Sequence, residues 1–216
     1  MATLFPRWSD TAFRLALVGL VLLGVGGVVG LFLYVRTPDN LNRYFPVDQP
    51  VPFDHRHHVQ DDGIDCRYCH DTVTHSAFAG IPSTAVCMGC HNQVWPRSPV
   101  LEPVRRSYFT GLPLPWNRVH DLPDFVYFNH AIHVNKGVGC VTCHGRVDEM
   151  ALVYQVAPLT MGWCLDCHRA PEAHLRPRTE ITSMTWQPSG DAKALGRQLA
   201  EEYGVRHLTH CTACHR

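Results

Sequence analysis

All ten cysteines of this 216-residue chain lie in five C-x-x-C-H motifs, which we number one to five in chain order. Two thiols at this spacing can form thioether bonds to the two vinyl groups of one haem, and the following histidine can bind its iron. One such motif also suits a redox or zinc dithiol, but five of them predict five haem c groups. The predicted attachment cysteines and proximal iron ligands are Cys66, Cys69 and His70; Cys87, Cys90 and His91; Cys140, Cys143 and His144; Cys164, Cys167 and His168; and Cys211, Cys214 and His215.

A second axial ligand for each iron has to come from elsewhere in the chain. Two Phe-x-His-x-x-His patterns, which begin at Phe53 and Phe128, each supply two histidines three residues apart. Side chains at this spacing lie on one face of a helix. A further histidine precedes the second pattern closely and is the predicted fifth ligand. The predicted distal ligands are therefore His55, His58, His120, His130 and His133.

Other side chains compete for the distal positions. An iron bound by histidine and methionine has a higher reduction potential than one bound by two histidines. The methionine candidates are Met150, Met161 and Met184, although a methionine in such a chain is also common as core filler. Five histidines are weaker candidates, because they lie outside the paired spacing. These are His57, His75, His174, His207 and His210.

The two histidine patterns head an internal repeat, since each is followed by two haem motifs. A Pro-rich insertion separates the two copies, and residues 189–203 are predicted to form a helix capped by Ser189. The expected organisation is an N-terminal segment and anchor (1–36), a tether (37–52), dihaem module 1 (53–95), the insertion (96–123), dihaem module 2 (124–170) and a C-terminal segment with motif five (171–216).

Residues 37–216 leave little chain per haem, so porphyrin is expected to form much of the core. Sixteen prolines and sixteen glycines favour a loop-rich chain. The predicted fold is therefore mostly irregular, with small α-helices and modules like those of class III cytochromes. The formal net charge is zero, which is not the basic footprint of a nucleic-acid-binding protein.

The N-terminal region contains an uncharged run from Leu15 to Val35. At about 1.5 Å per residue it spans roughly 30 Å, the thickness of a bilayer core. A cleaved signal peptide is the alternative, but its apolar run is shorter and ends in a small-x-small site. The run therefore favours an uncleaved anchor in the cytoplasmic membrane. Because haem c is attached outside that membrane, we expect residues 37–216 on its periplasmic face.

Glycines in the predicted anchor favour close packing against other membrane helices. Gly26 and Gly30 form a small-x-x-x-small pair, which lets a second helix approach. Glycine is also common in membrane helices that have no such partner. The spacing is thus a hypothesis for partner proteins in the membrane.

Several strings resemble the pentahaem cytochrome c subunit of alternative complex III over nearly the whole chain. They are GIDCRYCH, SAFAGIP, VHDLPDFVYFNHAIHV and LTMGWCLDCHR. The resemblance implies a respiratory or photosynthetic quinol-oxidising complex with transmembrane quinol-site subunits, a monohaem cytochrome c and an iron–sulfur subunit. It also implies mostly bis-histidine irons, with methionine as the other ligand type.

Three functions compete on this evidence. The first is an electron-transfer subunit, not an enzyme on its own, that relays electrons from a quinol-oxidising membrane complex to a periplasmic or membrane-bound acceptor. The second is a free-standing, single-anchor quinol dehydrogenase that feeds a periplasmic reductase. The third is a multihaem nitrite- or hydroxylamine-type enzyme, which needs an open iron. The sequence has no C-x-x-C-K motif of the kind that marks some of these enzymes.

Overall fold

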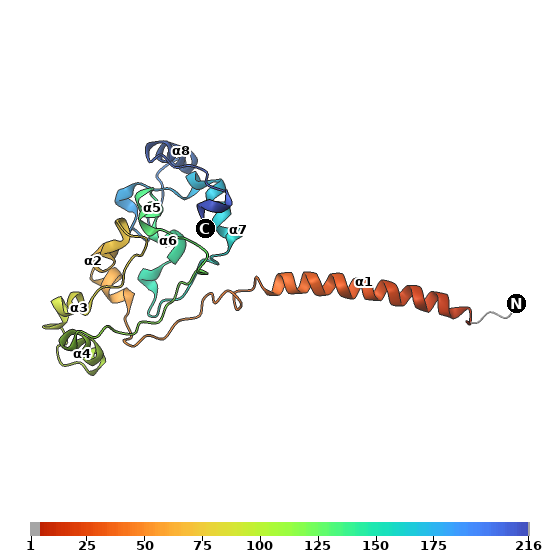
Figure 1. Ribbon diagram of the computed structural model, residues 1–216. Helices are drawn as coiled ribbons and strands as arrows, with labels where there is room; N and C mark the ends of the chain where they lie inside the picture. Colours follow the sequence, from red (N-terminus) through yellow and green to blue (C-terminus); the bar gives the residue numbers. More distant parts are fainter. Residues whose placement is uncertain (1–4, 216) are drawn as a thin grey trace. The chain divides into compact units, whose positions relative to one another are not determined.

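A computed structural model describes residues 5–215 of the chain. The chain divides after Arg43 into an N-terminal unit and a larger unit that begins at Tyr44 (Figure 1). The first unit carries the long helix α1 (Trp8–Tyr34), and the second carries all five haem motifs.

Helix α1 covers the predicted apolar run except its last residue, Val35, and starts seven residues before the run. The extra turns include an exposed ion pair between Arg14 and Asp10, one helical turn apart. At its end, Asn40 and Thr37 side chains donate to the Tyr34 carbonyl oxygen, at 2.7 and 2.9 Å. Such bonds satisfy carbonyl groups that the last turn leaves unpaired. The helix is long and apolar enough to cross a membrane, with a mean hydropathy of 2.6. A membrane anchor and a signal sequence both have these properties.

The larger unit is built from short helices joined by irregular segments. Residues 5–215 contain no strand, and isolated bridges join Val126 to His215 and Val138 to Leu175. The helices and helical turns of this unit, in chain order, are η1 (Arg56–Asp61), α2 (Cys66–Cys69), η2 (Asp71–Thr74), α3 (Thr84–His91), η3 (Pro99–Leu101), α4 (Glu102–Thr110), α5 (His130–Asn135), α6 (Cys140–His144), η4 (Val147–Glu149), α7 (Met161–Arg169), η5 (Pro171–His174), η6 (Arg178–Glu180), α8 (Ala192–Glu202) and η7 (Cys211–Ala213).

Apolar side chains of this unit form three small clusters and no continuous core. Among residues 5–215, no large side chain is fully buried. The clusters consist of Val51, Met88, Leu101 and Val104; of Val73, Val134 and Ile181; and of Leu175, Leu199 and Tyr203. A self-sufficient domain of this length would bury far more of its aliphatic side chains in one place.

The Pro-rich insertion contains helix α4, which the sequence did not predict. Its Val104 is buried beside Met88, a residue within motif two, so α4 packs along α3 (Figure 1). The segment that follows is tied back to the tether, where Gln49 and Asn117 exchange two hydrogen bonds of 2.9 Å each. The insertion therefore packs against α3, the helix that carries motif two.

The predicted C-terminal helix exists but begins later than expected. Ser189 does not cap it; the Asp191 carboxylate accepts the N–H groups of Lys193 and Ala194, so α8 starts at Ala192. Aspartate is as good a cap as serine, and it lies closer to the first apolar turn. Leu199 and Tyr203 are buried.

Candidate haem sites

Each C-x-x-C-H motif lies on a helical turn. The cysteines of motif one begin and end α2, and motifs two, three and four lie in α3, α6 and α7. In motif five, η7 begins at Cys211 and ends just before Cys214. On such a turn, two cysteines three residues apart project from the same side. In α2 the turn is fixed by the Asp65 side chain, which accepts the backbone N–H of Arg67. The five motifs thus have the local shape that two thioether bonds to one porphyrin require.

The two histidine patterns adopt nearly the same side-chain arrangement. Phe53 meets His55 edge-on at 4.8 Å between ring centres, and Phe128 meets His130 in the same way at 4.8 Å. Phe53 also stacks on His58 at 4.3 Å, as Phe128 does on His133 at 4.4 Å. The phenylalanine in each copy therefore holds both imidazoles in fixed orientations.

This agreement exists despite a difference in backbone. The second pattern begins α5, as the spacing predicted, whereas His55 precedes a π-helical turn, η1. The prediction of an ordinary helical face for the first pattern was therefore wrong. The aromatic contacts are what the two copies share.

Three of the predicted distal imidazoles face a proximal histidine across a similar gap. Ring centres are 6.1 Å apart for His58 and His91, and 6.0 Å for His133 and His168. His130 lies 6.3 Å from His144. With metal–nitrogen bonds of roughly 2 Å, two imidazoles on opposite sides of one iron have ring centres about 6 Å apart. The spacings thus fit an iron between each pair.

Motif three has a second candidate partner. His120 lies 4.4 Å from His144, and its Nε2 atom is buried without a hydrogen-bond partner. A buried ring nitrogen of this kind is costly unless it binds something, and a metal is one solution. His120 is thus placed at motif three, where His130 also lies.

Motif five lacks such a facing imidazole. The His215 ring lies 5.7 Å from the ring of Phe125, and none of the predicted distal histidines has a ring contact with it. The methionine candidates differ in position: Met150 is buried, Met184 is partly buried and Met161 is exposed at the start of α7.

The Nδ1 atoms of six histidines are directed at backbone carbonyl oxygens. In neutral imidazole this arrangement makes Nδ1 the donor and leaves Nε2 free to bind metal. The sequence could not reveal these partners, because every residue has a carbonyl group. The bonds run from His58 to Asp54 (2.9 Å), His70 to Gly80 (2.6 Å), His91 to Val94 (3.0 Å), His130 to Ala77 (2.9 Å), His133 to Asn129 (2.8 Å) and His215 to Phe125 (3.1 Å).

Burial favours the neutral form of four histidine side chains among the predicted iron ligands. It lowers the pKa of His55 and of His120 to about 4, and that of His144 to about 3. Burial also lowers the pKa of His133. Only a neutral imidazole has a lone pair to donate to iron, so these rings are in the binding form at neutral pH.

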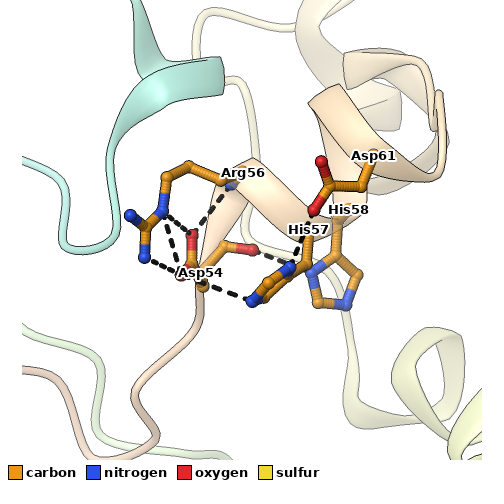
Figure 2. A network of polar contacts seen from close by, with 5 residues as sticks. All are labelled: Asp54, Arg56, His57, His58 and Asp61. Carbon is orange, nitrogen blue, oxygen red and sulfur yellow. Dashed lines mark hydrogen bonds and ion pairs between the residues drawn. The ribbon is translucent and has the colours of Figure 1, made fainter.

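His57 has a different environment from its neighbours. Figure 2 shows its ring turned toward two carboxylates, with Nδ1 2.8 Å from Asp61 and Nε2 3.9 Å from Asp54. Asp54 is itself bound by Arg56, whose side-chain hydrogen bond lowers the pKa of that carboxyl to about 2. Both ring nitrogens of His57 thus face surface charges and no proximal histidine. Among the other weak candidates, His75, His207 and His210 are exposed.

The motifs, the facing imidazoles and the orphaned Nε2 atom together fit haem c. This combination of residues and contacts is similar to that of a multihaem cytochrome c domain. Residues 126–216 match the family described as cytochrome c7 and related cytochrome c. This match confirms the predicted fold class of short helices and irregular segments around haem.

A particular relative carries the comparison further. Over 138 residues the chain is 38% identical to a protein of Nitratidesulfovibrio vulgaris (Hildenborough) named menaquinone reductase, multihaem cytochrome c subunit. The alignment covers 63% of this chain and spans 64% of that relative.

Proposed function

We propose that this chain is a pentahaem electron-relay subunit of a membrane complex that oxidises quinol, of the type of alternative complex III. The observation that carries the proposal is the repeated pair of facing imidazoles at motifs two and four. Iron closed on both axial sides is suited to passing single electrons and leaves no position for a substrate. Haem c supplies the redox change when it is bound.

The residues of the chain hold the iron ligands in place. We assign His55, His58, His130 and His133 as the distal ligands of motifs one to four, in that order. Phenylalanine stacking and the carbonyl bonds to Nδ1 support the assignment, because they fix each ring and leave Nε2 available. His120 competes with His130 at motif three, and motif five takes a ligand from His120 or from the methionine candidates.

The organisation of the chain follows from this assignment. Residues 53–95 and 124–170 form the two dihaem modules, residues 1–36 include the anchor, residues 37–52 the tether, residues 96–123 the insertion and residues 171–216 the segment with motif five. The apolar helix α1 supports attachment to the cytoplasmic membrane, with the haem unit on the periplasmic face. Transmembrane quinol-site subunits, a monohaem cytochrome c and an iron–sulfur subunit are the proposed partners.

The name of the relative favours a second candidate. A menaquinone reductase passes electrons to the quinone, whereas the complex proposed above takes electrons from the quinol. The same haem unit can serve either direction, since the potentials of the donor and acceptor decide it. A free-standing quinol dehydrogenase is the third candidate, and it needs no other membrane protein.

Purification in mild detergent separates these functions. We expect co-migration with multi-helix subunits, five haems per chain and quinol oxidation by the complex alone. Quinone reduction without quinol oxidation would support the second candidate, and quinol oxidation by the isolated chain the third. A high-spin haem with an open axial position, detected by EPR, would contradict the relay.

A further inference from the structure

Residues 181–182 contact the chain at the first cysteine of motif three and just before the first cysteine of motif one. The Cys140 N–H group donates to the Ile181 carbonyl oxygen at 3.0 Å. The next residue, Thr182, donates its hydroxyl to the Asp65 carboxylate at 2.8 Å, and Asp65 directly precedes Cys66. The dipeptide 181–182 therefore fastens the start of motif one to the start of motif three.

The Cys66 and Cys140 side chains interact at this junction. The Cys66 and Cys140 thiols share a hydrogen bond, which raises the pKa of Cys66 and lowers that of Cys140. In the haem-bound protein these atoms are thioether sulfurs, which have no proton. Ile181 also packs with Cys140, Val73 and Val134 in one apolar cluster. The contact is therefore supported by packing that does not depend on the thiol protons.

Within each module, one histidine pattern serves both motifs. His130 and His133, on the single helix α5, face His144 of motif three and His168 of motif four. In module 1, His58 faces His91 of motif two. Phe53 contacts both His58 and His55, the ligand assigned to motif one. Ligands three residues apart can serve only irons that are neighbours. Motifs one and two are thus adjacent, as are three and four.

Motif five joins module 2 at the segment before α5. The Cys214 carbonyl oxygen accepts the N–H group of Tyr127 at 2.8 Å, and His215 donates to the Phe125 carbonyl oxygen at 3.1 Å. The same segment continues to Phe128, whose ring stacks at 4.4 Å on His133, the ligand assigned to motif four. Motif five therefore lies beside motif four.

From these contacts we propose that the five motifs form one row in the spatial order two, one, three, four, five. The row departs from chain order, because the modules join through Cys66 and Cys140 and not through motifs two and three. Motifs two and five are its two ends. The inference rests on the proposed relay and deepens it, since it states which haems are neighbours.

The repeat offers a matched pair of variants to test this order in the full haem-loaded chain. His58→Met and His133→Met change equivalent residues, and each raises the potential of one haem, so that this haem can be reduced alone. A reduced low-spin haem is diamagnetic and no longer perturbs the EPR signals of its direct neighbours. We expect one other signal to change in His58→Met and two in His133→Met. Two changed signals in His58→Met, as chain order requires, would overturn the row.

A density map of the unaltered protein in its complex gives a test that needs no variant. We expect the four shortest iron–iron distances to join motifs two and one, one and three, three and four, and four and five. Any other pair among the four shortest overturns the inference.

The two proposals fail separately. A complex with this order of irons but without quinol oxidation removes the proposed function and leaves the row. Quinol oxidation with another order of irons removes the row alone.

Discussion

Each imidazole has two ring nitrogens, and the partner of one decides what the other can do. In the described chain, six histidines direct Nδ1 at a carbonyl oxygen, and five of the six belong to facing ring pairs or to motif one. His57, one residue from His58, has both nitrogens against carboxylates. These adjacent histidines thus differ in the partners of their ring nitrogens, although they are the same residue type.

This difference predicts unequal effects of the same substitution. His58→Met is expected to raise the potential of one haem by on the order of 100 mV, because axial ligands set haem potentials over roughly 0.8 V. His57→Met is the matched control and should leave all five potentials unchanged. A spectroelectrochemical titration measures both. Equal shifts in the two variants would remove His58 from the ligand set.

Asp65 provides a second test at this scale, since its carboxylate caps α2 and binds Arg67. Asp65→Ala is expected to lose about 1 kcal/mol of unfolding free energy, the usual value of a helix cap. Asp65→Asn keeps a good cap and loses only the charge. Thermal unfolding followed by circular dichroism measures both variants.

The charge of Asp65 also gives a pH dependence with a definite sign. The side-chain hydrogen bond from Arg67 lowers the pKa of Asp65 from 3.8 to about 2. Because the pKa of Asp65 is lower in the folded state than in the unfolded state, its charge stabilises the fold at any pH above 3.8. This contribution is lost as the pH falls toward 2. The stability difference between the natural protein and Asp65→Asn should therefore be larger at neutral pH than at about pH 3. A difference that grows on acidification would contradict the ion pair.

At the scale of helices, the sequence predicted what depends on local pattern and missed what depends on packing. The haem motifs, α1 and α8 follow from residue types at short spacing. The boundary of α8 shifted because Asp191 competes with Ser189 as a cap. Helix α4 was missed, since its polar sequence among prolines is stabilised by contact with α3, a distant partner.

Gly196 allows α8 to pack closely on the turn η5. A Cβ atom at this position would collide with the Glu172 carbonyl oxygen. Gly196→Ala should therefore cost about 1–3 kcal/mol through overpacking, although alanine in an open helix gains about 1 kcal/mol over glycine. Arg197→Ala, at the exposed next position, is the control and should change stability little. Denaturant unfolding measures both, and a stabilised Gly196→Ala would show that α8 does not pack there.

At the scale of the whole molecule, the N-terminal helix decides where the haem unit resides. An uncleaved α1 predicts a membrane-bound chain whose intact mass includes residues 1–36 and five haems. Replacing these residues with a cleavable export signal should release a soluble, haem-loaded unit. Fractionation and mass spectrometry test both outcomes. A natural chain that begins after the apolar run would identify α1 as a signal peptide.

The three separate apolar clusters have a consequence for biogenesis. The apoprotein has no interior large enough to offset the conformational entropy lost on folding. We therefore expect covalent haem attachment and folding to the native state to be one event. In cells without the cytochrome maturation machinery, we expect the polypeptide to stay unfolded and to be degraded by proteases.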